Sequence, residues 1–305
     1  MLSHHYCISG LTVACAFHLS GANLTNANGT KPDVRVWLGD VPEALTGGCN
    51  LGPNWDMAGE QVLLKVPKLA RFLIRSGQEI VIALEAGATE RDASAYVLGT
   101  AFGILLHQRS ALVLHGSAVA RGGEAIAICG HSGAGKSTFA AALCRSGCSF
   151  VTDDLCAISL DHHEHPVILP DGRQLKLWQD AIEKLDLTGQ RGEAVMGRFE
   201  KYFIAPIDLA PVALPLRAIY ILQDARPPFE EGIEALSLVD AMHALDREAY
   251  RPGLRLKMGA RSELVTQSAR MLAHVKIFRF RRPLEFAKLP QAVDRILSHW
   301  GALGS

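Results

Sequence analysis

Short apolar runs rich in β-branched residues dominate the first hundred residues of the chain. The runs at residues 12–17, 34–38 and 79–84 are separated by turn-forming stretches, a pattern typical of strands. Residues 66–76 are followed by Gly77, a common helix terminator, and this segment predicts one helix. We therefore expect an N-terminal accessory α/β domain over residues 1–100, for packing or for partner recognition.

The pattern changes after residue 90. Residues 93–108 predict a helix, and residues 112–120 are rich in strand formers. The tight-turn sequence Arg121-Gly122-Gly123-Glu124 then leads into a second apolar strand at residues 125–129. Two strands joined by a Gly-Gly turn predict an antiparallel hairpin, which opens a second domain over residues 101–305.

A phosphate-binding motif follows this hairpin, with the pattern G-x-x-x-x-G-K-[ST]. Its glycines let the backbone bend so that N–H groups point inward, and the helix expected from Lys136 to Arg145, stopped by Gly147, adds its positive end. Lys136 supplies a cation for phosphates and Ser137 a hydroxyl for Mg²⁺. The alternative is a chance match, but a strand before and a helix after the loop argue against it. The predicted ATP-binding residues are Gly130, Ser132, Gly133, Ala134, Gly135, Lys136, Ser137 and Thr138.

Two adjacent carboxylates, Asp153 and Asp154, interrupt an apolar strand just after the helix of this loop. Phosphoryl transfer needs one group near the metal and one that orients the attacking hydroxyl, and paired carboxylates suit both tasks. A solvated Asp-Asp turn is the alternative, which the apolar surroundings disfavour. His115 ends the strand beside the loop's own strand, so it is a candidate to hydrogen-bond one of the aspartates, although such a histidine is often structural.

The ordered series formed by residues 114–119, the hairpin, the loop at 130–137 and Val151-Thr152-Asp153-Asp154 resembles the HPr kinase/phosphorylase family. The resemblance covers residues 110–160 and implies an α/β fold with a P-loop kinase core like that of phosphoenolpyruvate carboxykinase. It implies that Asp153 is the catalytic base, that Asp154 joins Ser137 in holding Mg²⁺ and that His115 supports the base. It also implies a serine as acceptor.

The chain departs from that family after residue 160. The family's downstream glycine-rich signature with its metal-binding glutamate is absent, which places HPr itself and a reverse phosphorylase reaction in doubt. Leu175-Lys176-Leu177-Trp178 and Lys201-Tyr202, with the separate N-terminal domain, look more like the kinases found with lasso-type precursor peptides. The implied phosphoryl-contacting cations are Lys176 and Lys201, with Arg173 a weaker candidate. A small-molecule kinase and an ATP-gated binding protein remain the alternatives.

The amino-acid composition limits the kinds of partner that we expect. The chain has 305 residues, 49% of them hydrophobic, and its 31 Lys and Arg balance 31 Asp and Glu. Without an excess of basic residues we expect no nucleic-acid partner. We expect no membrane span either, because the longest uncharged apolar stretch, residues 95–106, is too short. With seven cysteines, no CxxC pair and no signal-peptide pattern, we expect a cytoplasmic protein, with a homo-oligomer left open.

One further charged segment stands near the C-terminal end. Arg279 and Arg281 alternate with apolar residues and Arg282 follows, a pattern typical of a strand with one charged face. Such a face is usually solvated. The alternative is a docking strip for an acidic peptide.

Overall fold

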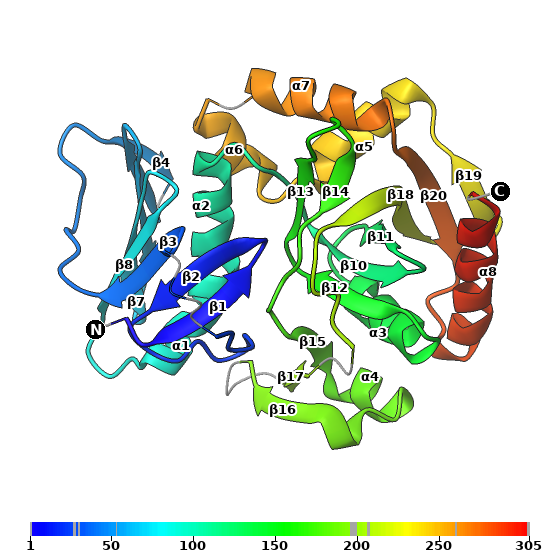
Figure 1. Cartoon of the computed structure of the whole chain (residues 1–305), viewed down its shortest axis with the longest axis horizontal. Coiled ribbons are helices and arrows are strands. Elements are labelled where there is room, and N and C mark those ends of the chain that lie inside the picture. Colours follow the sequence, from blue (N-terminus) through cyan, green and yellow to red (C-terminus); the bar gives the residue numbers. More distant parts are fainter. Residues whose placement is uncertain are drawn as a thin grey trace.

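The computed structural model describes the chain apart from residues 1, 27–28, 30, 53, 196–199, 206–207, 260 and 304–305, and apart from the side chains of residues 51, 261 and 262. Within the described residues the protein is a mixed α/β structure with one eight-stranded, one nine-stranded and one three-stranded sheet. In Figure 1 the eight-stranded sheet lies on the left and the nine-stranded sheet on the right, with a helical segment between them.

The first sheet is built mainly from antiparallel neighbours, in the order β1-β2-β3-β8-β7-β6-β5-β4. Only β3 runs parallel to its neighbours β2 and β8. Its strands are β1 (His4–Ile8), β2 (Leu11–Cys15), β3 (Val34–Leu38), β4 (Cys49–Gly52), β5 (Trp55–Ala58), β6 (Gln61–Val66), β7 (Ala70–Arg75) and β8 (Glu79–Leu84). The strands expected at residues 12–17, 34–38 and 79–84 are therefore confirmed within one or two residues.

The prediction of a helix over residues 66–76 is wrong, because β6 and β7 form an antiparallel hairpin there. Ala70, Phe72 and Ile74 are fully buried in one core, which is the period of two that a strand imposes. Gly77 has φ +63° in the turn between β7 and β8, where Gln78 N–H bonds the Arg75 carbonyl. The glycine thus closes a hairpin and does not end a helix.

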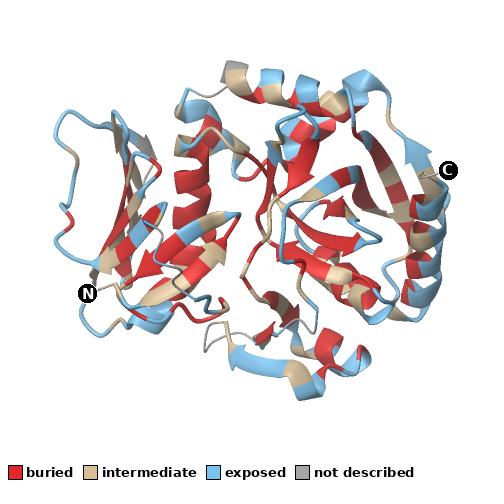
Figure 2. Cartoon of the chain, viewed as in Figure 1, coloured by how far each residue is buried: buried red, intermediate tan, exposed pale blue. Residues whose placement is uncertain are grey.

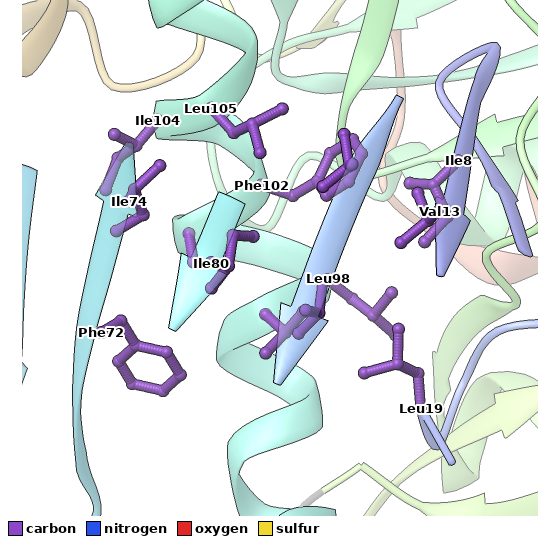
Figure 3. Packing of buried hydrophobic residues seen from close by; sticks show 14 of the residues in the cluster. Ile8, Val13, Leu19, Phe72, Ile74, Ile80, Leu98, Phe102, Ile104 and Leu105 are labelled. Atoms are coloured by element: carbon purple, nitrogen blue, oxygen red, sulfur yellow. The ribbon is translucent and has the colours of Figure 1, made fainter. Parts of the chain in front are cut away.

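The expected helix at residues 93–108 is confirmed, with an earlier start. It comprises α1 (Glu90–Tyr96), a π-helical turn (Val97–Ala101) and α2 (Phe102–Gln108), opened by a capping box between Thr89 and Asp92. Its apolar face packs on the first sheet, where Leu98 and Phe102 lie among residues such as Ile80 (Figure 3). The boundary expected between residues 100 and 101 falls inside this segment.

The second sheet carries the predicted hairpin, in which β10 pairs with β11 and Arg121 lies opposite Glu124. β11 and β18 are parallel, as are β18 and β20. The segment expected as one strand at residues 112–120 is two strands. β9 ends at Leu114 and pairs with β13, whereas β10 begins at Gly116 and pairs with β11 and β12. The strands are β9 (Leu112–Leu114), β10 (Gly116–Arg121), β11 (Glu124–Cys129), β12 (Ser149–Asp153), β13 (Cys156–Leu160), β14 (Pro166–Ile168), β18 (Leu214–Asp224), β19 (Gly232–Ala235) and β20 (Lys276–Arg282).

Helices cover both faces of this second sheet. On one face α3 and α8 enclose a core with Phe139, Phe280 and Ile296, and on the other α5 and α7 enclose a core with Leu245 and Met271. These helices are α3 (Lys136–Arg145), α5 (Leu238–Glu248), α7 (Arg261–Leu272) and α8 (Leu289–Ala302), with α6 (Pro252–Lys257) between α5 and α7. None of the described helices is both long and apolar enough to cross a bilayer.

A three-stranded sheet lies below the second sheet in Figure 1. It has the order β15-β17-β16, and α4 follows its first strand. The elements are β15 (Leu175–Trp178), α4 (Gln179–Lys184), β16 (Arg191–Ala194) and β17 (Lys201–Ile204), with short 3₁₀ turns at Thr188–Gln190 and, before α8, at Phe286–Lys288.

The two halves of the molecule share a buried ion pair. Arg173 is 1% exposed, and its guanidinium donates to the Asp171 carboxylate, to the carbonyls of Leu98 and Leu155, and to the Ser9 hydroxyl. It therefore links the β1–β2 turn and the π-helical turn to the segment just after Asp154. Figure 2 shows buried positions continuing from the first sheet through α2 toward the second. With its guanidinium fully enclosed, Arg173 is not a cation that reaches a phosphate.

Candidate functional site

The segment between β11 and α3 has the backbone geometry that the sequence motif predicts for a phosphate-binding loop. Gly130 and Gly135 have φ of +141° and +83°, and a Cβ on Gly130 would lie 2.8 Å from the Leu222 carbonyl oxygen, so a side chain fits poorly at either position. Helix α3 begins at Lys136, as expected, and no side chain caps its first turn. The N–H groups of that turn are therefore free to bind an anion.

Most of the predicted loop residues face one cavity of ≈ 450 Å³, which we call the central cavity. It is lined by Ser132, Gly133, Gly135, Lys136, Ser137 and Thr138 from the loop and by His115, Asp153, Asp154, Lys176 and Lys201 from elsewhere. Ala134 is the exception among the side chains, because it is buried beneath the loop. The cavity brings together residues from Ala95 to Lys201, which lie 106 positions apart in the chain.

Lys136 is folded back onto its own loop. Its ammonium donates to the carbonyl oxygens of Gly130 at 2.8 Å and His131 at 3.2 Å. Burial lowers the pKa of Lys136, and neighbouring acidic groups oppose that effect. Phosphate oxygens accept stronger, charge-assisted hydrogen bonds than carbonyls do. We therefore expect the ammonium to exchange these carbonyls for a bound phosphate.

Asp153 ends β12 and lies against the loop helix. Its Oδ1 accepts hydrogen bonds from the Ser137 hydroxyl at 2.9 Å and the Ser117 hydroxyl at 2.6 Å, and its Oδ2 accepts one from the Lys176 N–H at 3.3 Å. A serine hydroxyl beside a carboxylate, both facing the central cavity, is the kind of oxygen-rich pair that Mg²⁺ takes alongside phosphates and water. The residues present thus fit a magnesium ion.

Asp154 has a different neighbourhood and a strained backbone, with φ +76°. Its carboxylate lies 3.2 Å from the Lys176 ammonium and 3.3 Å from His115 Nδ1. Burial alone would raise the pKa of Asp154, but Lys176 and then His115 outweigh it and hold that pKa well below its usual range. The π-helical turn lies beside Asp154, since a Cβ on Gly99 would be in van der Waals contact with Asp154 Oδ2, at 3.9 Å.

These contacts differ from the roles that the family resemblance implies for the two aspartates. The resemblance pairs Ser137 with Asp154 and His115 with Asp153. In the structure Ser137 bonds Asp153, and His115 lies beside Asp154. The reason is the left-handed backbone at Asp154, which turns its side chain away from that of Asp153, toward β9 and β15. His115 does contact one of the two aspartates, as expected, and that aspartate is Asp154.

Lys201 lies on the far wall of the central cavity. It is opposite Trp178 in the β15–β17 pair, and its ammonium lies 5.8 Å from the Trp178 ring centroid. Within the described part of the chain Lys201 forms no ion pair. It is therefore a cation that can turn toward a phosphate, whereas Lys176 is already engaged with Asp154.

Two residues that support the loop were not predicted from the sequence. Glu248, at the end of α5, accepts a hydrogen bond from Gly130 N–H at 2.9 Å, and its carbonyl accepts one from His115 N–H at 2.7 Å. Arg282, at the end of β20, donates to the Ala134 carbonyl at 3.0 Å and lies over the Phe139 ring. Both support the loop from positions more than a hundred residues away, and no local motif marks them.

The three arginines at residues 279–282 all have partners within the fold. β20 is a strand, as predicted, but Arg279 and Arg281 both pair with Glu234 on the neighbouring strand β19, at 3.1 and 3.0 Å. Arg282 is buried against the loop. Arg279 and Arg281 thus share a single carboxylate, which offsets one of their two charges.

Two further cavities adjoin the central one. A cavity of ≈ 690 Å³, which we call the front cavity, shares Ala95, His115, Ser132 and Asp154 with it. A cavity of ≈ 450 Å³ on the opposite side of the loop shares Gly133, Gly135, Thr138 and Trp178 with it. Of these three cavities, Lys136 and Ser137 line only the central one. A triphosphate bound at Lys136 therefore has one cavity on each side.

No protein-family model and no curated protein sequence matches the chain. Among solved structures, the chain is similar to an HPr(Ser) kinase/phosphatase from Coxiella burnetii, with 12% sequence identity and a TM-score of 0.34 over 63% of this chain and 99% of the other. The likeness is distant, and the assignment of the site rests on the contacts described above.

Proposed function

We propose that the chain is an ATP- and Mg²⁺-dependent kinase that transfers the γ-phosphoryl group of ATP to a hydroxyl. One observation carries the proposal. A single cavity is lined both by Lys136 and Ser137 of a phosphate-binding loop and by the carboxylates of Asp153 and Asp154. A loop for the triphosphate beside two carboxylates with different partners supports transfer more than binding alone.

The contacts support a division of labour between the carboxylates. Ser137 and Asp153 would hold Mg²⁺, which when bound neutralises charge on the phosphates. Lys136 would grip the phosphates, and Lys201 would add a donor for the charge that spreads over the phosphoryl oxygens in the transition state. Asp154 would then face the acceptor, with Lys176 and His115 fixing its orientation.

The proposed step moves one phosphoryl group and one proton. The acceptor oxygen forms a bond to the γ-phosphorus, and the bond from that phosphorus to the β–γ bridging oxygen breaks with its electron pair going to ADP. The hydroxyl proton passes to Asp154 and then to water. Asp154 is a weak base, because Lys176 and His115 outweigh burial and keep its pKa low. It therefore acts mainly by orienting the hydroxyl, which suits a transition state in which the proton leaves late.

The acceptor that we propose is a serine of a peptide or small protein, with lasso-type precursor peptides as first candidates. The sequence resemblance in residues 110–160 and at Lys176 and Lys201 supports this choice. A small-molecule kinase is the second candidate. The observation that favours it is the front cavity at Asp154, since its ≈ 690 Å³ lies in the range of small-molecule sites.

The test is transfer from γ-labelled ATP with Mg²⁺ to serine peptides, to HPr and to small hydroxyl compounds. We expect label on an acceptor with the wild type, and loss of at least a hundredfold in Lys136→Ala and Asp154→Asn. Arg295→Gln serves as the control, because Arg295 pairs with Glu231 on the surface away from the three cavities. Tight ATP binding without label on any acceptor would contradict transfer and would leave an ATP-gated binding protein.

A further inference from the structure

The front cavity has walls from both halves of the molecule. Ala95, Tyr96, Gly99 and Thr100 line it from α1 and the π-helical turn, and Gly130, His131 and Ser132 line it from the phosphate-binding loop. The connection between α5 and α6 closes the third side. Asp154 and His115 lie where this cavity meets the central one, so a molecule in the front cavity has its reacting end at Asp154.

The charges in this cavity are not balanced. Its two carboxylates are already engaged, because Asp154 pairs with Lys176 and Glu248 pairs with Arg247 and accepts from Gly130 N–H. Arg251, in contrast, forms no ion pair with any described residue. The cavity therefore presents one guanidinium whose charge the described residues leave unmatched.

Arg251 is nevertheless held in place. Its Nη2 donates to the Thr100 hydroxyl at 2.8 Å, and its guanidinium carbon lies 5.7 Å from the ring centroids of both Trp55 and Tyr250. Its backbone is left-handed, with φ +47°, which an arginine adopts at a cost. A guanidinium fixed by two rings and a hydroxyl, with donors still free, is suited to planar recognition of a carboxylate or phosphate.

We propose that the front cavity binds the phosphoryl acceptor and that Arg251 holds an anionic group of that acceptor, a carboxylate or a phosphate. The first part rests on the proposed kinase function, because it takes Asp154 as the group that orients the hydroxyl. The acceptor class is therefore a hydroxyl compound or serine peptide that carries a negative charge on the side away from the reacting hydroxyl.

The N-terminal unit, by which we mean the first sheet together with α1 and the π-helical turn, has a role in this proposal. Trp55 on β5 and Thr100 in the π-helical turn both position Arg251, and Gly99 of the same turn lies beside Asp154. π-Helical turns often occur at functional sites because they bring backbone and side chains out of the regular helical register. The N-terminal unit would thus select the acceptor, while the loop of the second sheet binds the donor.

The test compares charged and neutral partners of the same shape. The probes are glycerol 3-phosphate against glycerol, and acetyl-glycyl-serine as its free acid against its amide, titrated calorimetrically with Mg²⁺ and a non-hydrolysable ATP analogue. We expect at least one charged probe to bind more tightly than its neutral counterpart. Arg251→Gln should weaken that charged probe roughly tenfold to a hundredfold, the value of a charge-assisted contact, and leave the neutral probe and the nucleotide unchanged.

Two further variants separate recognition from folding. Thr100→Val keeps the charge but removes the hydroxyl that fixes the guanidinium, and should weaken the charged probe by a smaller factor. Arg295→Gln should change nothing. Equal binding of both members in both pairs, or undiminished binding of the charged probe in Arg251→Gln, would overturn the proposal. Charge-selective binding that needs Arg251, without transfer of label to any acceptor, would instead contradict the kinase function and leave the anion site standing.

Discussion

The ion pair between Lys176 and Asp154 allows a quantitative prediction. At the observed 3.2 Å, with an effective dielectric constant of about 20, the Coulomb attraction amounts to roughly 5 kcal/mol. The net stabilisation is smaller than this attraction, because water screens the Asp154 side chain, which is 28% exposed, and because both charged groups lose part of their hydration. Hydrogen bonds to charged groups contribute about 1.5–3 kcal/mol net. We therefore expect Lys176→Met to lower the free energy of unfolding at pH 7 by about 1.5–3 kcal/mol.

The pH dependence has a definite sign. The depressed pKa of Asp154 stabilises the fold above the ordinary aspartate range, and this stability is lost as pH falls through the folded-state pKa. Lys176→Met removes the largest influence that lowers this pKa, so the pKa rises. The acidic limb of the kcat/KM profile should move to higher pH, because Asp154 acts as the carboxylate.

A double-mutant cycle isolates this pair. Lys176→Met, Asp154→Asn and the double variant would be unfolded with urea at pH 7, and the two single changes should couple by about 1.5–3 kcal/mol. The pH profile of the single lysine variant would be measured beside the wild type. A coupling energy near zero, or an acidic limb that stays in place, would refute the assignment of Lys176 as the group that keeps Asp154 ionised.

Three other predictions follow from the packing. Arg173→Met should destabilise the protein by about 3–5 kcal/mol in urea unfolding, because it leaves Asp171 buried and unpaired, and Arg173→Met combined with Asp171→Leu should recover part of that loss. Gly103→Ala places a Cβ 2.3 Å from the Tyr250 ring, so it should raise the KM of the acceptor in steady-state assays while the KM of ATP changes little. Cys49 should react with a thiol reagent well before the other cysteines, because it is exposed while burial raises the pKa of the other six thiols.

The loop, its helix and the hairpin before it were predictable because each depends on residues close together in the chain. Gly-Gly at 122–123 is sufficient for a tight turn, and Gly133 to Ser137 carry their own geometry. The carboxylate pair was likewise visible as charge within an apolar strand. Which carboxylate meets which partner was not, because that depends on one backbone torsion at Asp154 and on β15, more than twenty residues further on.

The error at residues 66–76 has a similar origin. Val66, Ala70 and Ile74 fit the spacing of a helix face, yet Ala70, Phe72 and Ile74 equally fit the alternation of a strand. The choice is made by β6, whose Leu64 lies opposite Phe72 and buries it. A strand whose pairing partner ends only a few residues before it is hard to recognise when the turn between the two strands, at residues 67–69, lacks glycine.

The most consequential contacts lie between the halves of the chain and therefore leave no local trace. Arg173 binds the carbonyl groups of Leu98 and Leu155, so the π-helical turn and the backbone after Asp154 are fixed to one guanidinium. If the N-terminal unit were only an appendage, loss of this link would reduce stability and leave kcat for a given acceptor unchanged. Because Gly99 lies against Asp154 and Thr100 against Arg251, we expect a displaced helix to alter acceptor binding as well. If the proposed function holds, the N-terminal unit forms one wall of the acceptor site, and we expect acceptor choice to follow its sequence more than that of the loop before α3.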